Sequence, residues 1–306
     1  GERTMPRRNQ FSWSVSRMKE FDFCLRHYYW RRYGSWGGSG ARASSEAHEA
    51  FVLKYVTSLS LHLGSIIHRT CARFWRDRQK GKSLSEQEAQ RTTIRALYAG
   101  IGESERGGWQ RRVSSGTHLF EHVYGGDLSE ERLARARDWI TRSLGGFYNL
   151  DLVQRARSTD QTLEVVSVEK REHFELAGTT VHVVMDLVVR GPDGEYVIWD
   201  WKSGDKKEAN EFQGAVYALY GQRAWKVPVE RLRMRIAYLQ PQVVQELVLT
   251  PEVLTETQAR IQASIGAMRA RLRDVEENVA HVDDFPMTDD LTLCSRCVFR
   301  RLCGRQ

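Results

Sequence analysis

The sequence predicts an α/β fold of the α+β type, in which β-hairpins alternate with helices. Two runs rich in β-branched and aromatic residues, 181–190 and 195–202, flank a Gly-Pro-Asp-Gly turn, a pattern typical of a β-hairpin. The alternating run 162–175 predicts a strand that pairs with this hairpin. A second hairpin is expected from 231–239 and 243–249, which flank a Gln-Pro-Gln turn.

Helical periodicity divides the rest of the chain into regions around these strands. We expect an N-terminal helix and loop in 1–44, a helical region in 45–160, the hairpin core in 161–250 and a C-terminal region in 251–306. The C-terminal region begins with a helix from Pro251 to about residue 277 and ends in a cysteine cluster. Much of the second region, 80–157, is polar and helical, and its residues indicate no particular chemistry.

The composition favours a polyanionic partner and excludes a membrane-spanning protein. The 306 residues are enough for one large domain, or for one domain with a helical insertion. Lys and Arg number 46 against 39 Asp and Glu, a net charge of +7, although many basic proteins have no polyanionic ligand. The sequence has no apolar run of membrane-spanning length and no export leader, so we expect a cytoplasmic protein without membrane contact.

Two acids and a lysine lie in the apolar runs of the first hairpin: Asp186, Asp200 and Lys202. The strand period of two puts Asp200 and Lys202 on the same face. A carboxylate in an apolar strand is costly unless a cation or donor meets it, and two of them suit a hard divalent cation. The alternative is that both pair with lysines or face water. Gln213 and Tyr217, four residues apart on the next helix, share one face.

These residues resemble, in order and spacing, the active-site pattern of the PD-(D/E)XK nucleases, in particular their RecB-like branch: Asp186, Asp200-x-Lys202 and Gln213-x-x-x-Tyr217. The resemblance implies a mixed, restriction-endonuclease-like sheet flanked by helices, with a variable helical insertion. It also implies that the two acids and the carbonyl of Trp201 hold Mg²⁺ or Mn²⁺, while Lys202 orients or activates the attacking water. Gln213 and Tyr217 would steady the lysine or a flanking phosphate.

An upstream helix carries Gly64-x-x-x-His68, which is similar to a motif of the same branch. The resemblance implies that His68 reaches the catalytic metal from this helix. The alternative is a histidine that only packs in the core. Cys71 follows among apolar neighbours, and we interpret it as a packing residue.

The segment 12–33 has helical periodicity, and we expect the N-terminal helix to begin within it after Ser14, a fair N-cap. It is similar to the N-terminal signature of iron–sulfur RecB-like nucleases, a serine-led helix followed by Cys-Pro-Arg-x-Tyr-Tyr. In this chain the segment is Cys24-Leu25-Arg26-His27-Tyr28-Tyr29. Because Leu25 replaces the proline, we expect the helix to continue there.

Three of the five cysteines lie close together near the end of the sequence, as Cys294-x-x-Cys297 and Cys303. Without an export leader they indicate metal or cluster chemistry rather than disulfides, and both zinc and iron–sulfur sites need a fourth ligand. His281 is a candidate for a zinc site. The resemblance to AddB-type nucleases instead implies that Cys24 is the fourth ligand and that the group is a 4Fe–4S cluster. Such a cluster would hold the N- and C-terminal segments together in one iron–sulfur-stapled knob. Free thiols remain a third possibility.

Together these patterns predict a metal-dependent nuclease that hydrolyses phosphodiester bonds in DNA. End-directed cutting is common in the resembled branch, which implies an exonuclease acting on single-stranded or frayed ends. The alternative is a non-catalytic nucleic-acid-binding or scaffold subunit. The branch serves DNA repair, CRISPR adaptation and phage-linked systems, which implies a helicase or integrase as a partner. Basic and aromatic residues near the cysteines would guide the strand: Arg26, Tyr28, Tyr29 and Arg300.

Overall fold

The computed structural model describes residues 8–158, 163–204, 206 and 208–305. The predicted α/β (α+β) fold is confirmed. Its centre is a five-stranded sheet in the order β3-β6-β7-β8-β9, in which β7 and β8 are parallel and the other neighbours antiparallel. The strands are β3 (Glu164–Val168), β6 (Leu187–Arg190), β7 (Tyr196–Lys202), β8 (Leu232–Tyr238) and β9 (Val243–Leu247). Both predicted hairpins, β6–β7 and β8–β9, are present.

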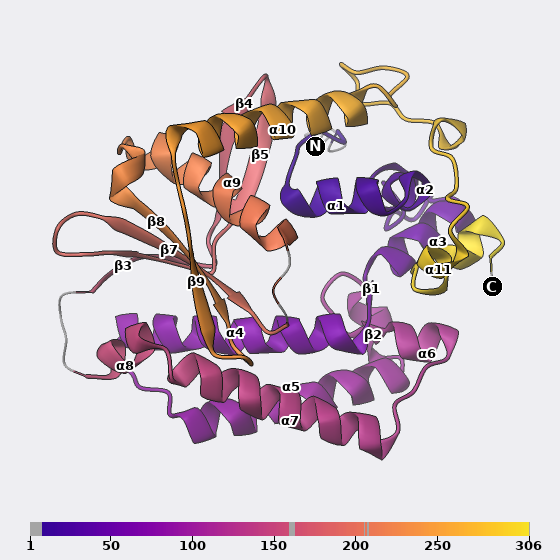
Figure 1. Cartoon of the computed structure of the whole chain (residues 1–306). Helices are drawn as coiled ribbons and strands as arrows, with labels where there is room; N and C mark the ends of the chain where they lie inside the picture. The colour runs from indigo at the N-terminus through magenta and orange to yellow at the C-terminus, as the bar shows by residue number, and fades with distance from the viewer. Residues whose placement is uncertain (1–7, 159–162, 205, 207, 306) are drawn as a thin grey trace, which may run out of the picture.

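Helices cover both faces of this sheet, as Figure 1 shows. Side chains alternate along the strands, so Val188 and Ile198 pack towards one face while Leu187 and Trp199 pack towards the other. The first face is covered by α9 (Glu208–Trp225) and α10 (Pro251–Arg269). The second is covered by α4 (Leu59–Gln79), α7 (Glu130–Tyr148) and α8 (Asp151–Arg157), with α5 (Glu86–Glu105) packed on α4 and α7.

Two expected strands are each divided in the structure. The run 162–175 forms β3 and then β4 (Arg171–Leu176), while 181–190 forms β5 (Thr179–Val184) and then β6. β4 and β5 pair with each other in a separate two-stranded sheet. Both runs therefore leave one sheet and join another, which alternation along the sequence does not reveal. Residue 162 and the expected boundary at 160–161 lie outside the described residues.

The N-terminal helix is also divided, contrary to the expectation that it continues past Leu25. Ser14 caps α1 (Val15–Phe23) by accepting a hydrogen bond from the Arg17 amide. Cys24 is extended, with φ −171° and ψ 128°, and α2 (Leu25–Tyr29) follows. The chain continues through a π-helical turn, η1 (Trp30–Gly34), to α3 (Ser45–Lys54). The family-like turn at the cysteine is therefore kept without a proline.

The C-terminal segment packs beside the N-terminal helices α2 and α3. α11 (Leu291–Ser295) and the 3₁₀ turn η5 (Arg300–Cys303) pack beside α2 and α3, and Trp30, Leu53 and Phe299 form a small core between them. The helix from Pro251 ends at Arg269, earlier than expected, and Asp274 accepts the amides of residues 276 and 277 in a turn further along the chain.

The remaining elements are short. They are β1 (Val56–Thr57), β2 (His118–Leu119), α6 (Phe120–Tyr124), η2 (Gly108–Arg112), η3 (Val229–Arg231) and η4 (Val282–Asp284). Helices dominate residues 86–157, as expected for that region. None of the helices in the described ranges combines the length and apolar character needed to cross a bilayer.

Candidate active site

Asp186 lies in the gap between β5 and β6, where the chain passes from the small sheet to the large one. The prediction that it sits within a continuous strand is therefore wrong. Its Oδ2 accepts a hydrogen bond from the Trp201 amide at 2.7 Å, and its Oδ1 lies 3.1 Å from His68 Nδ1. The side chain is buried, and His68 approaches it from α4, as the resemblance implied. Both carboxylate oxygens are thus oriented by neighbouring elements.

Asp200 and Lys202 lie at the end of β7 on one face, as the strand period predicted. Lys202 Nζ lies 2.7 Å from Asp200 Oδ2 and donates to Gln213 Oε1 at 3.3 Å. Gln213 Nε2 in turn donates to the Tyr217 hydroxyl at 2.6 Å, one turn further along α9. The chain of contacts holds the lysine between the acid and the amide. All four side chains line one cavity with Asp186 and His68.

Burial and mutual charge shift the pKa values of this group. Burial lowers the pKa of His68, but the Asp186 carboxylate outweighs it and raises the value to about 9. Burial raises the pKa of Asp200 to about 6; Lys202 opposes this shift and Asp186 adds to it. Burial, followed by the charges of Asp200 and Asp186, raises the pKa of Tyr217 far above its usual value, so its phenol stays neutral. Additional positive charge would therefore favour the ionised form of Asp200.

Glu169 belongs to the same site, although its side chain was assigned no role from the sequence. His68, Glu169 and Asp186 each offer a ligand atom, and these atoms lie within 4.8 Å of one another. Glu169 follows β3 with φ 45°, a left-handed conformation that is unusual for glutamate and typical of functional positions. Its amide donates to the Asp186 carbonyl at 3.2 Å. Burial and Asp186 raise the pKa of its carboxyl, while Arg76 opposes the shift.

This donor set fits a hard divalent cation. Carboxylate oxygens are the ligands that Mg²⁺ and Mn²⁺ prefer, and one imidazole is compatible with Mn²⁺. Asp200 is buried and Lys202 lies 2.7 Å from its Oδ2 as an ion pair; a carboxylate has further lone pairs, so it keeps capacity for a cation. Ligation by Asp200 and by the Trp201 carbonyl remains a prediction.

The cavity in front of these residues has basic walls. Its volume is about 430 Å³, which is large enough for a nucleotide-sized group. Besides the acids, it is lined by the first turn of α1 and by Arg32, Arg171 and His182. The acids can therefore bind a cation while the arginines of the same cavity attract an anion. A phosphodiester with its metal ion has this combination of charges.

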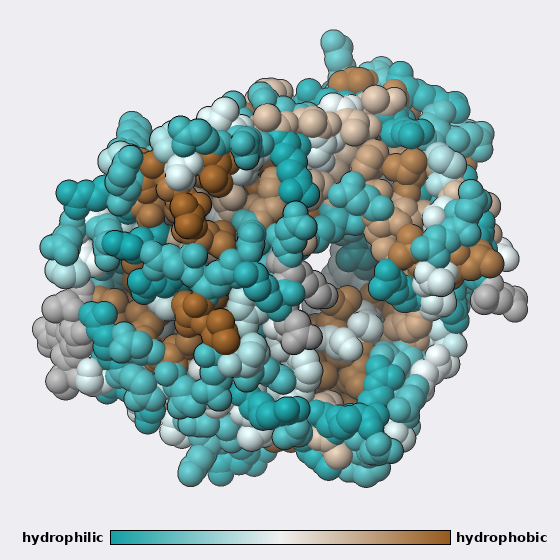
Figure 2. Space-filling view, in the orientation of Figure 1, coloured by the Kyte–Doolittle hydropathy of each residue, from teal (hydrophilic) through white to brown (hydrophobic). Residues whose placement is uncertain are grey.

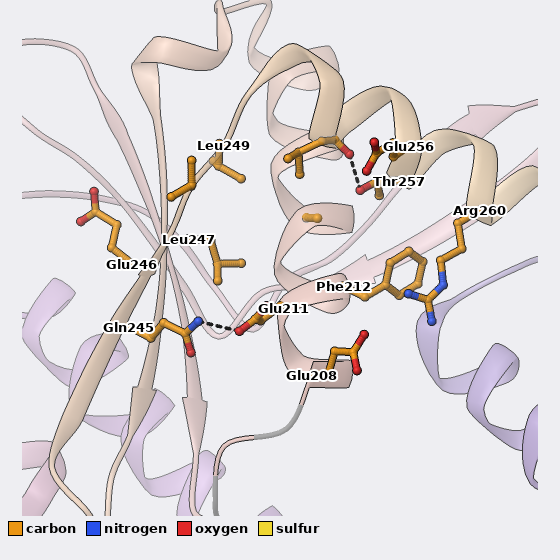
Figure 3. A pocket seen from close by; sticks show the side chains of 13 residues that line it. Glu208, Glu211, Phe212, Gln245, Glu246, Leu247, Leu249, Glu256, Thr257 and Arg260 are labelled. Atoms are coloured by element: carbon orange, nitrogen blue, oxygen red, sulfur yellow. Dashed lines mark hydrogen bonds between the residues drawn. The ribbon is translucent and has the colours of Figure 1, made fainter.

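A second hollow has the opposite character. It lies between β9, α9 and α10, has a volume of about 460 Å³, and is lined by Glu208, Glu211 and Glu256 around an apolar floor that includes Leu247 and Phe212 (Figure 3). Gln245 donates to Glu211 across it. Its carboxylates would repel a phosphodiester, so we do not assign nuclease chemistry to it.

Four of the five cysteines line one cavity at the junction of the chain ends: Cys24, Cys294, Cys297 and Cys303. Burial raises the pKa of Cys297 to about 12, and His27 Nδ1 lies 3.3 Å from its sulfur. Cys71 lies apart, fully buried in α4, as expected for a packing residue. His281 does not line the cavity and pairs with Asp283, so it is not placed to complete a zinc site.

Four thiolates are a donor set that either a zinc ion or a 4Fe–4S cluster can use. Zinc–sulfur bonds of about 2.3 Å would put the sulfurs roughly 3.8 Å apart. Among the described residues, these cysteines do not form a set whose sulfurs all lie within 4.8 Å of one another. A cubane binds each thiolate to a different iron, and the ligands therefore stand further apart. The 4Fe–4S cluster therefore remains a prediction that rests on the resemblance and on the shared cavity.

The predicted nucleic-acid contacts near the cysteines are largely occupied within the protein. Tyr28 is only 1% exposed and stacks on Phe285, so it has no free face for a base, contrary to expectation. Tyr29 is partly buried against the same ring. Arg26 donates to the Phe285 carbonyl, and Arg300 donates to the carbonyls of residues 124 and 295. Their role in nucleic-acid binding is therefore not supported by these contacts.

A mixed sheet that ends in an acid–x–lysine pair, faced by a histidine from a neighbouring helix, is the arrangement of nucleases with a restriction-endonuclease-like fold. The chain belongs to the PD-(D/E)XK nuclease superfamily, whose family model matches residues 12–304. Members of this superfamily are generally nucleases that use Mg²⁺ or Mn²⁺. A search among curated proteins gave no match to the chain.

Proposed function

We propose that the protein is a Mg²⁺- or Mn²⁺-dependent deoxyribonuclease that acts as an exonuclease on single-stranded or frayed DNA ends. The observation that carries this proposal is the convergence of His68, Asp186 and the Asp200–Lys202 pair on one cavity that basic residues also line, with Glu169 beside His68 and Asp186. Its assignment to the RecB/AddB-like branch, and with it the preference for ends, is supported by the likeness of the motifs described above.

In this mechanism each side chain has a distinct task. Glu169, Asp186 and Asp200, together with His68 once the cation displaces its proton, would hold the divalent cation, which would lower the pKa of a bound water and neutralise charge on the phosphate. Lys202 lies 2.7 Å from Asp200 and orients the attacking water through its remaining N–H groups. Gln213 accepts from Lys202 and donates to Tyr217, and so fixes the position of the lysine.

The four cysteines have a structural role in this proposal. A 4Fe–4S cluster held by Cys24 and the three C-terminal cysteines would tie the ends of the chain together and close a very long loop. It would fix α1 and α2 beside the cavity that α1 lines. Partners that supply DNA ends, such as a helicase or integrase, are part of the same proposal, as are roles in repair, CRISPR adaptation or phage defence.

The test is a time course on end-labelled single- and double-stranded DNA with Mg²⁺ or Mn²⁺, with EDTA as the blank. Asp186→Asn keeps an acceptor for the Trp201 amide, and Lys202→Met keeps the length of the side chain. Each should lower the cleavage rate by at least about 100-fold while the melting temperature stays near that of the parent. Asp193→Asn, in the exposed turn of the same hairpin, is the matched control and should cut normally.

Two results would contradict the proposal. Cleavage that survives both substitutions would place the active site elsewhere. DNA binding without any cation-dependent cleavage by the parent protein would favour the alternative of a non-catalytic scaffold subunit. Internal cutting of circular single strands would refute only the preference for ends and would leave the nuclease activity itself in place.

A further inference from the structure

Four cations gather beside the catalytic cavity, and we call them the cation cluster: Arg17, Arg31, Arg32 and Lys54. They come from α1, η1 and the end of α3. Glu20 lies among them and forms ion pairs with Arg31 at 2.9 Å and with Arg32 at 2.5 Å. The cluster is thus built by three separate elements around a single carboxylate.

The positive charge of this cluster exceeds the negative charge that pairs with it. Arg17 donates to the Ser12 carbonyl at 2.7 Å and Arg31 to the Lys54 carbonyl at 2.9 Å, and both acceptors are uncharged. Within the described ranges, Glu20 is the carboxylate that pairs with the cluster. Burial, followed by the charges of Arg32, Arg31 and Arg17, lowers the pKa of Lys54 to about 8. Partly buried cations of like sign are costly without an anion between them.

Two residues of the cluster also line the cavity that contains the proposed metal-binding acids. Arg17 and Arg32 line the catalytic cavity and also a second cavity of about 60 Å³, into which Lys54 and Trp36 face. That volume suits one phosphate group and is too small for a base. In Figure 2 the molecule is hollowed at its centre, in the region between α1 and α4 of Figure 1. A strand at the metal centre could therefore continue past the cluster.

Two neighbouring features suit the same ligand. Ser14, Val15 and Ser16, the cap and first turn of α1, line the catalytic cavity, and this turn contains no acidic residue. The amides of a first helical turn lack partners within the helix and favour an anion. Trp36 lies at the second cavity with 48% of its surface exposed, which leaves its ring accessible to an unpaired base.

We propose that Arg17, Arg32 and Lys54 bind a backbone phosphate of a single DNA strand whose neighbouring phosphodiester lies at the metal centre, and that Trp36 stacks on one of its bases. The inference deepens the proposed function, on which it rests, by assigning a single strand as the substrate that the active site holds. A paired base could not stack on Trp36 while it remains in a duplex.

The binding experiment uses a short fluorescein-labelled oligothymidylate with Ca²⁺ in place of Mg²⁺, and measures the affinity by anisotropy at several NaCl concentrations. Each phosphate contact on a single strand contributes about 0.7 to the slope of log K against log salt. Lys54→Met should reduce the slope by about 0.7. Lys80→Met is the matched control and should leave the slope unchanged, because Lys80 lines neither cavity and follows the C-terminal end of α4, a helix of 21 residues that spans about 30 Å. Trp36→Ala should weaken binding by about 5- to 100-fold with the slope retained.

A parallel assay separates this inference from the proposed function. Bis(p-nitrophenyl) phosphate reaches the metal centre but is too short to reach Trp36, so Trp36→Ala and Lys54→Met should reduce cleavage of the oligonucleotide more than cleavage of this diester. Unchanged slope in Lys54→Met together with unchanged affinity in Trp36→Ala overturns the inference, even if DNA is cut. If the predicted binding losses occur but the parent cleaves neither substrate, the phosphate subsite stands and the nuclease proposal fails.

Discussion

The pair formed by His68 and Asp186 predicts that the protein loses stability as the pH rises when divalent cations are removed. The pKa of His68 is about 9 in the folded chain, against an ordinary value of 6.5. A group whose pKa is raised by folding contributes stability in full below the unfolded value, and this stability is lost as the pH rises through the folded value. The loss attributable to His68 should therefore fall between pH 6.5 and 9.

The size of the effect follows from the same shift. Each pKa unit corresponds to 1.36 kcal/mol, so the difference between 6.5 and 9 gives about 3 kcal/mol as an upper limit. Solvent screening reduces it, because 27% of the His68 side chain is exposed. Lys54 acts in the opposite direction above pH 8, since its pKa is lowered by folding and its neutral form is favoured. A variant that lacks only the histidine isolates the contribution of the pair.

The measurement is urea unfolding in EDTA, followed by tryptophan fluorescence, at pH 6.5 and pH 9. The parent should lose about 1–3 kcal/mol of unfolding free energy from His68 over this range, and His68→Gln should lose correspondingly less. His281→Gln, at an exposed histidine that also pairs with an aspartate, is the control and should behave like the parent. If His68→Gln and the parent lose the same unfolding free energy between the two pH values, the His68–Asp186 pair is not the cause of the pH dependence.

Three further predictions follow from individual contacts. Glu169→Gln should weaken Mn²⁺ binding by about 10- to 100-fold in calorimetry, whereas Glu164→Gln, at an exposed position of β3, should not; equal affinities would remove Glu169 from the site. Cys24→Ser should lower the iron content and visible absorption of anaerobically purified protein, while Cys71→Ser keeps both; normal iron in Cys24→Ser would refute the staple. Ser14→Ala removes the cap of α1 and should cost about 1 kcal/mol in denaturant unfolding, and no loss would show that the cap is replaced.

The parts of the fold that were predicted correctly depend on local chemistry. The hairpin β6–β7 follows from a Gly-Pro-Asp-Gly turn between two β-rich runs, and the cap at Ser14 follows from a serine before an apolar repeat. The position of Lys202 beside Asp200 follows from the strand period alone. Each of these features is determined by residues a few positions apart, so the sequence contains the information directly.

The parts that were missed depend on contacts between distant segments. The division of 181–190 into β5 and β6 is set by the pairing of β5 with β4 and by its bridge to Trp13, neither of which leaves a trace in the alternation. Glu169 reaches the metal site because the chain turns at a positive φ between two sheets. Its sequence signal, an acid at the end of an alternating run, is shared by many strands whose acids face solvent. Cys24 was joined to the C-terminal cysteines only through the family resemblance.

The distribution of charge around the catalytic cavity explains why both a cation and an anion are expected there. Asp186 and Asp200 line the cavity, with Glu169 close to Asp186, and Arg17 and Arg32 line the same cavity. If this arrangement served folding alone, the two groups would neutralise each other directly. Among the described residues no ion pair joins them; the acids pair with His68, Lys202 and Arg76, and the arginines with Glu20 and a main-chain carbonyl. The arginines therefore keep positive charge beyond that of their single carboxylate partner, which a phosphodiester would balance, while a divalent cation would compete with the side-chain cations for the acids.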